Sequence, residues 1–393
     1  MGTLYENDKK YILNLYNRLN LEVERAEGVY IYDKDNNKYL DMYSGISVNN
    51  LGYDKGVATA IKKQVDKYIH LSNYFVSEPT VNLAKLLVDN SFAAKVYFSN
   101  SGTEANEGAL KLCRKYGRSI SADKFEILSA LNSFHGRTCG GLTLTGQEKY
   151  QRDFKPLLSG VNYFEFNNIE SLRKSVNKNT CAVFLEIIQG EGGIIEVSQE
   201  FINEVVRLSK IYNFLIVIDE IQTGIGRSGD LFAFEKYNFN PDIVTLAKSI
   251  GGGLPLGAIL VSERLEKVLK IGDHGSTFGG NPVACAAGEF ILDKVVNTNL
   301  LDEVKEKSKY ILDELEKIKK EFPTLIKEIR GRGMMIGIDV DENAIAIRDN
   351  ALREKLLLNV TNKTVIRLLP PLCITYNEIN EFLEKFRVVL RGI

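Results

Sequence analysis

The central part of the chain alternates short apolar runs with longer amphipathic stretches. Between about residue 95 and residue 262 there are seven such runs, and several are apolar throughout, which is typical of strands covered on both faces. The runs are KVYFS, FEILSA, VNYFEF, CAVFLEI, FLIVIDE, DIVTLA and GAILVS. Helical patterns such as EANEGALKLCRKYG and SQEFINEVVRLSKIYN lie between them. This alternation predicts an α/β fold with a mostly parallel sheet, in which ligands bind beyond the carboxyl ends of the strands.

The pattern changes after about residue 295. One helical stripe within residues 301–322 consists of Val304, Ile311, Leu315, Ile318 and Phe322. The N-terminal segment GVYIYDKDNNKYLDM predicts a hairpin with an Asp-Asn-Asn turn that packs with the C-terminal part. We therefore expect a large α/β domain of residues 46–292 and a small α+β domain that combines residues 1–45 with residues 293–393.

Composition and charge argue against several classes of partner. The chain has 393 residues and a formal net charge of −1, so neither nucleic acid nor an anionic membrane is indicated. No apolar run approaches the roughly 20 residues that span a bilayer. The polar, acidic N-terminus argues against a targeting peptide. Five scattered cysteines without a CxxC pair and three distant histidines favour neither disulfides nor a metal site, and we expect a cytosolic protein.

Polar motifs follow four of the predicted strands. In FSNSGTEANEGALK a helix begins near Ser101, and Gly102 lets the backbone approach an anion such as phosphate. An ordinary helix start explains these residues equally well. In ALNSFHGRT, Phe134 can stack on a flat ring and Arg137 can bind a carboxylate. Taken alone, this second motif is better explained as a surface loop.

The other two motifs supply a carboxylate and a lysine. FLIVIDEIQTGIGRSG ends an apolar strand at Asp219, where a desolvated carboxylate needs a partner such as a protonated ring nitrogen. A Mg²⁺-binding aspartate of the Walker B type is the alternative. In DIVTLAKSIGGGLPLGA the glycines follow Lys248, whereas a phosphate loop requires them before the lysine. Burial at a strand end lowers the pKa of an amine, which favours a nucleophilic role for Lys248.

Together the four motifs fit one ligand. They provide a phosphate-binding helix start, a stacking aromatic ring, a carboxylate for a ring nitrogen and a desolvated lysine. A phosphorylated pyridine aldehyde requires all four. The sequence therefore predicts pyridoxal 5′-phosphate (PLP), bound covalently through Lys248.

Over nearly its whole length the chain resembles the class III (ornithine-type) aminotransferases of PLP fold type I. The motifs SNSGTEAN, SFHGRT, QGEGG, DEIQTGIGRSG, LAKSIGGGLPLGA and HGSTFGGNP carry the resemblance. It implies a large domain with a mostly parallel seven-stranded sheet, a smaller α+β domain and a transaminase site. It also implies a homodimer whose active sites lie at the subunit interface.

The resemblance implies a set of cofactor-binding residues. They are Gly102, Thr103, Phe134, Asp219, Gln222, Lys248 and Thr277. The first two would bind the phosphate, and the next three would stack on the ring, pair with its nitrogen and bind its hydroxyl. Lys248 would hold the cofactor and move the proton during transamination. Thr277 would reach the phosphate of the neighbouring subunit.

Charge and the resemblance together predict the substrate contacts. Arg137, helped by Ser276, would bind the carboxylate of N2-acetylornithine far from its reacting amine. Arg367 would bind the carboxylate beside the reacting carbon of glutamate or 2-oxoglutarate. With acetylornithine Arg367 lacks a partner, and Glu186 would neutralise it. Without the resemblance, a structural ion pair explains Arg367 better.

Within this family the segment MYSGISVNN favours a member that acts on N2-acetyl-L-ornithine and 2-oxoglutarate, in arginine biosynthesis. Ornithine, succinylornithine and 4-aminobutyrate are the alternative donors. A nucleotide enzyme is disfavoured by the order of the glycines, and a non-catalytic PLP-binding protein by the complete residue set. Two positions depart from the family pattern. They are Gly52-Tyr53-Asp54, where a histidine-containing loop is usual, and Ile187, where a proline is frequent.

Overall fold

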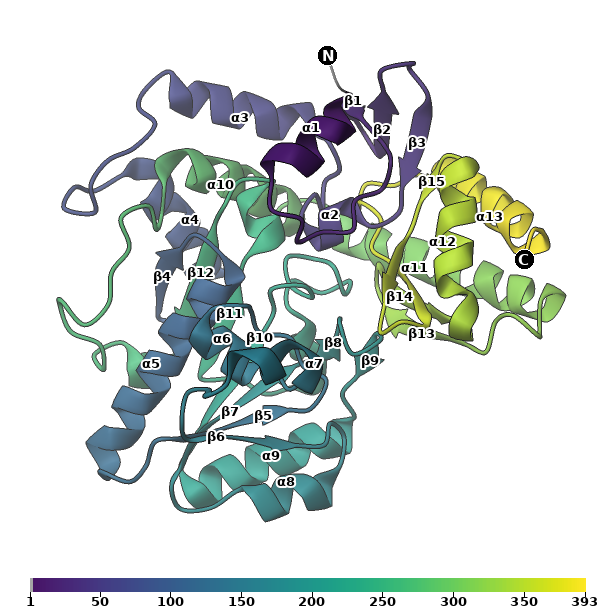
Figure 1. The fold of residues 1–393 in the computed structure, drawn as a ribbon. Coiled ribbons are helices and arrows are strands. Elements are labelled where there is room, and N and C mark those ends of the chain that lie inside the picture. The colour runs from purple at the N-terminus through teal and green to yellow at the C-terminus, as the bar shows by residue number, and fades with distance from the viewer. Residues whose placement is uncertain (1–2) are drawn as a thin grey trace.

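The computed structural model describes residues 3–393, which fold around a seven-stranded sheet (Figure 1). The strand order is β4-β12-β11-β10-β7-β5-β6. The strands are β4 (Lys95–Ser99), β5 (Glu126–Ala130), β6 (Val161–Phe164), β7 (Thr180–Glu186), β10 (Leu215–Asp219), β11 (Ile243–Leu246) and β12 (Gly257–Val261). Neighbouring strands from β11 to β6 are parallel, and β12 is antiparallel to both of its neighbours. The predicted mostly parallel α/β sheet is confirmed, with one reversed strand.

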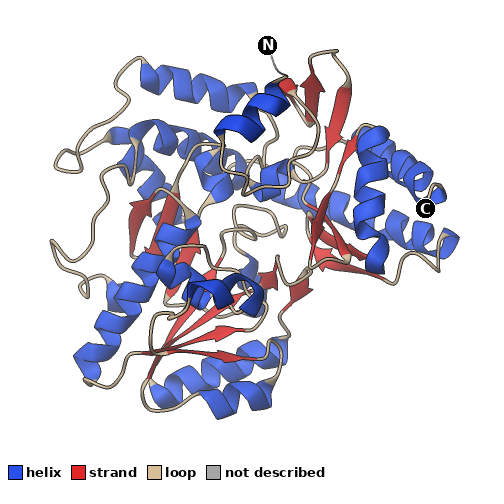
Figure 2. Ribbon diagram, viewed as in Figure 1, coloured by secondary structure: helices blue, strands red, loops and turns tan. Residues whose placement is uncertain are grey.

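Helices cover both faces of this sheet, so alternate side chains enter two separate cores (Figure 2). In β10, Leu215 and Val217 pack in the core of α5 (Gly102–Ile120), whereas Ile216 and Ile218 pack in the core that contains α9 (Gln199–Tyr212). Burial on both sides explains why the run FLIVIDE is apolar throughout. The other helices of this part are α3 (Lys55–Val65), α4 (Glu78–Asp89), α6 (Cys139–Leu144), α7 (Glu148–Gln151), α8 (Ile169–Ser175) and α10 (Pro282–Val296). A short hairpin, β8 (Ile188–Gln189) and β9 (Ile195–Glu196), follows β7.

The N-terminal hairpin lies beside the C-terminal part, purple and yellow in Figure 1. The N-terminal elements are α1 (Leu4–Tyr11), β1 (Val23–Glu27), β2 (Tyr30–Asp33), β3 (Lys38–Asp41) and α2 (Ser44–Ser47). The C-terminal elements are α11 (Leu300–Glu321), β13 (Glu328–Arg332), β14 (Met335–Asp339), α12 (Ala344–Arg353), β15 (Leu356–Leu357), β16 (Asn359–Thr361), β17 (Val365–Leu368) and α13 (Tyr376–Arg391). Strand β15 pairs with β3, so the predicted hairpin and its packing with the C-terminal part are confirmed. A second sheet has the order β13-β14-β17-β16.

The proposed domain limits fall inside two helices. The limit at residues 45 and 46 lies within α2, and the limit at residues 292 and 293 lies within α10. One hydrophobic core also contains residues from both parts, such as Ile218 and Leu368. The division into residues 46–292 against residues 1–45 and 293–393 therefore stays a prediction. Across residues 3–393, no helix is long and apolar enough to cross a membrane.

A fully buried arginine joins three distant parts of the chain. The Arg227 guanidinium donates hydrogen bonds to Ser47 Oγ (3.0 Å) and to Asn50 Oδ1 (2.6 Å). It also donates to the carbonyl oxygens of Met334 (3.1 Å) and Pro370. These four acceptors hold the loop after β10 against both the N-terminal and the C-terminal parts.

The segment MYSGISVNN contains a left-handed turn. All four residues of 44–47 have φ between 50° and 63°. The left-handed conformation costs a non-glycine residue about 1–2 kcal/mol, so the turn must be held from outside. Asp41 accepts the backbone N–H of Ser44 (2.9 Å), and Ser47 Oγ donates to the carbonyl oxygen of Gln222 (3.1 Å). The first bond holds the turn locally, and the second holds it against the loop that follows β10.

The departures from the family pattern have local structural roles. At Gly52, φ is 67° and a Cβ atom would lie 2.3 Å from the carbonyl oxygen of Gly28, so only glycine fits. Tyr53 donates its hydroxyl to Asp41 Oδ2 (2.9 Å), and Asp54 caps the N-terminus of α3. Ile187 is fully buried. The loop therefore joins the N-terminal hairpin to α3.

Candidate active site

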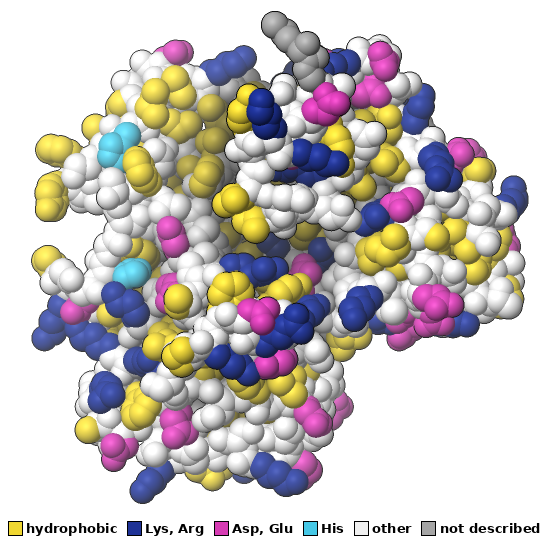
Figure 3. All heavy atoms as spheres, in the orientation of Figure 1, with side chains coloured by type: hydrophobic (Ala, Val, Ile, Leu, Met, Phe, Trp, Pro, Cys, Tyr) yellow, Lys and Arg dark blue, Asp and Glu magenta, His cyan; other side chains and the backbone are white. Residues whose placement is uncertain are grey.

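A cavity of about 470 Å³ lies at the carboxyl ends of the central strands. Figure 3 shows the molecule hollowed near the centre of the face in view, with Lys and Arg side chains beside the hollow. Most of the predicted site residues line the cavity: Gly102, Thr103, Phe134, Arg137, Glu186, Asp219, Gln222 and Lys248. A larger groove of about 540 Å³ between α3, α4 and α10 contains none of them.

Three polar side chains stand in a row across the sheet. Asp219 is paired in register with Thr245 of β11 on one side and with Glu186 of β7 on the other. Because side chains alternate along a strand, Asp219 continues the face of β10 that packs on α5, and Glu220 points to the opposite face. The register thus brings Asp219, rather than Glu220, to the cavity.

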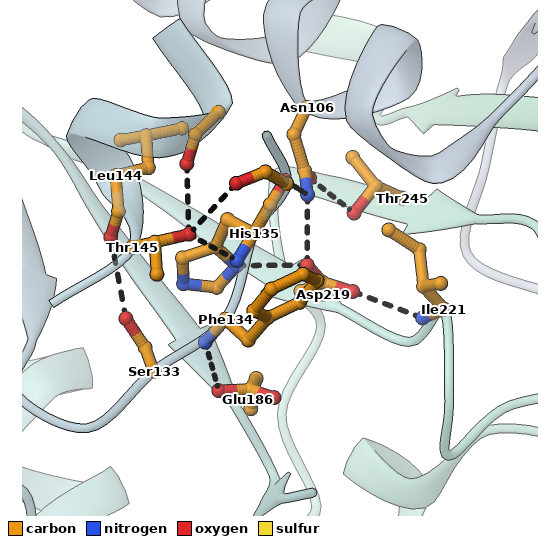
Figure 4. A network of polar contacts seen from close by, with 12 residues as sticks. Asn106, Ser133, Phe134, His135, Leu144, Thr145, Glu186, Asp219, Ile221 and Thr245 are labelled. Carbon is orange, nitrogen blue, oxygen red and sulfur yellow. Dashed lines mark hydrogen bonds and ion pairs between the residues drawn. The ribbon is translucent and has the colours of Figure 1, made fainter. Parts of the chain in front are cut away.

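The Asp219 carboxylate accepts three hydrogen bonds (Figure 4). Its Oδ2 atom accepts from Asn106 Nδ2 (2.8 Å) and lies 2.8 Å from His135 Nδ1, while Oδ1 accepts from the Ile221 N–H (3.0 Å). A carboxylate only accepts, so His135 Nδ1 carries the proton. Three donors favour an ionised Asp219, and a fixed anion here keeps a nearby ring nitrogen protonated.

His135 is a buried histidine whose charge is supported by its neighbours. Burial disfavours the imidazolium, but the hydrogen bond and charge of Asp219 raise the pKa of His135 above its usual value. Sequence reasoning assigned no role to His135 or to Asn106. Asn106 lies four residues after Gly102 on the same face of α5, and this spacing is the signal that identifies it.

Lys248 begins a 3₁₀ turn (Lys248–Gly251) directly after β11. Its φ is 53°, a left-handed conformation that costs a non-glycine residue about 1–3 kcal/mol and is typical of functional sites. Burial, and then the charge of Arg367, lower the pKa of the Lys248 amine to about 8. Gly252 and Gly253 have φ of 59° and 96° and reverse the chain, as the glycine run predicts. The neutral amine is therefore far more populated near physiological pH than it would be at the ordinary pKa of a lysine.

The backbone at the start of α5 lines the cavity closely, and the space there requires glycine at positions 102 and 136. Ser101 caps the helix by accepting the N–H of Glu104 (3.3 Å). A Cβ atom on Gly102 would lie 2.6 Å from Ile221 Cδ1, and a Cβ atom on Gly136 would lie 2.1 Å from Thr103 Oγ1. Free backbone N–H groups at a helix N-terminus favour an anion.

Arg367 lies behind the cavity wall and pairs with Glu191. Its Nη1 atom is 2.6 Å from Glu191 Oε1 and donates to Gln222 Oε1 (3.2 Å). Its Nε and Nη2 atoms donate to Asn359 Oδ1 (2.9 and 2.7 Å). Burial acts to raise the pKa of Glu191, but the charge and hydrogen bond of Arg367 lower it below the usual value. The pair is therefore an ionised, buried salt bridge.

The prediction that Glu186 neutralises Arg367 is therefore wrong. Glu186 ends β7 and its side chain follows the strand face towards Asp219, where it accepts the N–H of Phe134 (3.2 Å). The chain then continues through β8 and turns, which carries Glu191 to Arg367. The motif QGEGG contained this residue, but nothing in the motif indicates which acid faces the arginine.

Arg137 is exposed at the mouth of the cavity and has no acidic partner in residues 3–393. Its guanidinium carbon lies 4.1 Å from the ring centroid of Tyr150 and 5.6 Å from that of Phe134. Stacking on aromatic rings holds the planar group while its donors stay available.

Besides Arg367, two more predicted residues do not line the cavity. Ser276 Oγ accepts from Asn100 Nδ2 (3.0 Å) and from the N–H of Gly279 (2.9 Å), and Asn100 lines the cavity wall. Thr277, the next residue, is exposed to solvent. Their roles in substrate and phosphate binding stay predictions.

The family of the chain follows from comparison with known proteins. A family model described as aminotransferase class-III matches residues 12–390. The chain belongs to the class-III aminotransferases. Among curated relatives, this aminotransferase is 46% identical to the acetylornithine aminotransferase of Caldanaerobacter subterraneus subsp. tengcongensis, over 98% of each chain. It is 42% identical to the acetylornithine aminotransferase of Clostridium acetobutylicum, over 96% of this chain and 98% of that one.

Solved structures give the same fold. The ornithine aminotransferase of Toxoplasma gondii matches the class-III enzyme with a TM-score of 0.95 at 27% identity, over 100% of this chain and 96% of that one. The N-acetylornithine aminotransferase of Stenotrophomonas maltophilia matches with a TM-score of 0.86 at 34% identity, over 99% of each chain. The backbone is thus shared by enzymes named for different donors.

Aminotransferases of this class depend on PLP, so the class-III enzyme is a PLP-dependent transaminase. The residues of its cavity fit this cofactor. A buried amine, an oriented carboxylate, an aromatic ring and a glycine-lined helix start surround one cavity. The cofactor that the motifs predict is therefore the cofactor of the family.

Proposed function

We propose that this aminotransferase transfers the distal amino group of N2-acetyl-L-ornithine to 2-oxoglutarate. The products are N-acetyl-L-glutamate 5-semialdehyde and L-glutamate, and the reaction belongs to arginine biosynthesis. The proposal rests on a difference in ion pairing between two arginines, Arg137 and Arg367. Arg137 has no acidic partner among the described residues, whereas Arg367 is buried and neutralised by Glu191. The names of the curated relatives support the same substrate pair.

The two arginines suit two substrates of different charge. The distal amino carbon of acetylornithine bears no carboxylate, so Arg367 would keep its bond to Glu191 while Arg137 binds the only carboxylate. Glutamate and 2-oxoglutarate carry two carboxylates, and the second would draw Arg367 away from Glu191. A buried arginine with an exchangeable acidic partner can therefore serve both half-reactions.

The cofactor would be held by residues of three strand ends. Gly102 and Thr103 would bind its phosphate, Phe134 would cover one ring face and Asp219 would keep its ring nitrogen protonated. When bound, PLP supplies an electron-withdrawing ring that stabilises negative charge at the carbon next to the amine.

Two further residues would act at the reacting atoms. Gln222 accepts from Arg367 through its Oε1 atom, so its amide nitrogen is free to donate to the ring hydroxyl. The Lys248 amine would attach the cofactor and then carry the proton between neighbouring carbons, because its lowered pKa lets it both accept and release a proton.

Donors of the same class are the alternatives. Free ornithine is favoured by the backbone match to the Toxoplasma enzyme, but that match has only 27% sequence identity and describes the shared fold. A relative from Buchnera aphidicola, 42% identical, is named for both acetylornithine and succinyldiaminopimelate. Acylated donors are therefore the nearest competitors.

Steady-state kinetics with each donor tests the proposal. We expect kcat/KM for N2-acetylornithine to exceed that for ornithine and for 4-aminobutyrate by at least about tenfold, or about 1.4 kcal/mol in transition-state binding. The Lys248→Ala variant is the negative control and should lose the half-reaction that changes the visible absorbance of the bound cofactor. A clear preference for free ornithine would contradict the assignment.

A further inference from the structure

Glu186 is a buried carboxyl group without a cationic partner. It is 7% exposed and lines the cavity. Its carboxyl group accepts a hydrogen bond from the N–H of Phe134 (3.2 Å), and the backbone N–H of Gly190 also stabilises its charged form. No Lys or Arg side chain within residues 3–393 forms an ion pair with it, and Arg367 is bound to Glu191 instead. A charge that leaves water without such compensation is strongly disfavoured.

Asp219, the neighbour of Glu186 on strand β10, is well supplied with hydrogen-bond donors. Asp219 is paired with Glu186 in the β7–β10 register and accepts three hydrogen bonds, from Asn106, His135 and Ile221. Two buried carboxylates side by side cannot both ionise cheaply, and the better-solvated one keeps the charge. The hydrogen bonds to Asp219 therefore stabilise its negative charge, and Glu186 is the carboxyl group that keeps its proton.

The charged groups that face Glu186 do not shift it to the ionised form. They are His135 from the loop after β5, Asp219 from β10 and Lys248 from the turn after β11. Burial raises the pKa of Glu186 to about 8, the charge of His135 opposes the shift, and the charge of Asp219 adds to it. The balance of geometry and charge favours the protonated form at neutral pH.

We propose that Glu186 works as a neutral carboxylic acid that positions the Phe134 backbone and leaves Asp219 as the anion at the ring nitrogen. It is a positioning residue rather than a counter-ion for an arginine or for a substrate. This inference rests on the cofactor position proposed above, but it does not depend on which donor the enzyme uses.

A neutral Glu186 has a consequence for the reacting lysine. The negative charge of an ionised Glu186 would raise the pKa of Lys248 and favour its ammonium form. A protonated Glu186 removes that effect, so the amine stays available as a nucleophile and base near neutral pH. The strand end thus keeps Glu186 uncharged at neutral pH, and it lets Lys248 lose its proton more readily than an ordinary lysine does.

Infrared spectroscopy of the apoprotein tests the protonation state directly. We expect the wild type at neutral pH to show a protonated-carboxyl C=O band that disappears as the pH rises through about 8, and we expect Glu186→Gln to lack it. Glu220, on the other face of the neighbouring strand, also has its pKa raised by burial, to about 7. The difference between wild type and Glu186→Gln isolates the band of Glu186.

Cofactor binding provides a second readout. Glutamine keeps the shape of Glu186 and cannot ionise, so the Kd for PLP should stay within about twofold of wild type at neutral pH. Above about pH 8 wild type should weaken relative to Glu186→Gln, by up to about tenfold per pH unit, because only wild type gains the buried charge. Glu191→Gln is the matched control, and its infrared difference from wild type should show no protonated-carboxyl band at neutral pH.

Two results would overturn the proposal. One is a wild-type spectrum without a carboxyl band that titrates near pH 8, and the other is a loss of PLP affinity beyond about tenfold in Glu186→Gln at neutral pH. If Glu186→Gln does not fold, as judged by circular dichroism, the Glu220→Gln variant decides, because it removes the other glutamic acid band. None of these measurements uses an amino donor, so they fail or succeed independently of the substrate assignment.

Discussion

At the level of single residues, Arg367 can bind either Glu191 or a carboxylate of the substrate. It is almost completely buried, and Glu191 is its one charged partner in the described chain, beside the neutral oxygens of Asn359 and Gln222. A guanidinium in this position is always charged and needs an anion at all times. Substrate specificity therefore depends on how strongly Glu191 competes with a carboxylate of the substrate.

Neutralising that competitor should change which amino donor is preferred. We expect Glu191→Gln to raise kcat/KM for glutamate relative to acetylornithine by about tenfold or more, because Arg367 no longer has to leave an anion. Half-reaction rates with each donor, followed by the absorbance of the bound cofactor, measure the ratio. Glu328→Gln, at an exposed acid of β13, is the matched control. An unchanged ratio in Glu191→Gln would rule out this role.

The limits of sequence reasoning are visible at the same residues. Lys248 and Asp219 were predictable because each ends an apolar run at the edge where parallel strands meet ligands. Glu186 and Glu191 lie five positions apart after one strand, so the pattern cannot distinguish them. Only the path of the chain after Glu186 brings Glu191, and not Glu186, to an arginine that is 176 positions away in the sequence.

At the level of elements, the turn after Lys248 is packed tightly between helices. A Cβ atom on Gly252 would lie 2.8 Å from Ile291 Cδ1 of α10 and 3.1 Å from Val57 Cγ1 of α3, and φ at this position is 59°. Gly28 has nearly the same φ, 60°, but a Cβ atom there meets nothing within 4 Å. The two glycines separate the effect of backbone conformation from the effect of packing.

Alanine substitutions at the two positions should therefore differ. We expect Gly28→Ala to lower the free energy of unfolding by about 1 kcal/mol through the left-handed backbone alone. Gly252→Ala should lose about 1–3 kcal/mol more because the new methyl group is overpacked. Urea unfolding followed by circular dichroism measures both variants. Equal losses would show that the packing of the turn does not matter.

The elements themselves were largely predictable, with instructive exceptions. All seven apolar runs became strands, and the central ones are buried on both faces, which leaves a continuous apolar signature. The reversed direction of β12 follows from its connection, since only residues 247–256 separate it from β11 and a parallel crossover needs a dozen or more. The left-handed turn at residues 44–47 has no such signal, because one of its hydrogen bonds goes to Gln222, 175 positions away from Ser47 in the sequence.

At the scale of the whole molecule, one surface exposes several large apolar side chains. Large apolar side chains are exposed on the loop between α3 and α4 and on the loop before α10, which lie side by side in Figure 1. They are Ile69, Tyr74, Phe75, Val76, Ile271 and Phe278. Asn73 donates to the carbonyl oxygen of Ser276 (2.8 Å), so both loops adjoin Thr277. Such patches mark interaction surfaces, and we propose a homodimer formed through this face.

Sedimentation and cofactor binding test this assembly. We expect a dimer at micromolar concentration, and we expect Thr277→Ala to raise the Kd for PLP by about tenfold, because the hydroxyl would contact the phosphate of the partner. The exposed Thr59 of α3 supplies the control, and Thr59→Ala should leave the affinity unchanged. A monomer in sedimentation would exclude the arrangement. A dimer whose PLP affinity is insensitive to Thr277→Ala would exclude the phosphate contact alone.

The buried Arg227 also has a consequence for how the protein is made. The residues that line the cavity are all synthesised by Leu256, yet two of the four acceptors of Arg227 are the carbonyl groups of Met334 and Pro370. While the chain grows on the ribosome, this guanidinium has no complete set of partners, and Arg367 does not yet exist. We therefore expect the loop after β10 to reach its final conformation only when translation is nearly finished. In turn, we expect the cofactor to bind to the completed chain rather than to the nascent one.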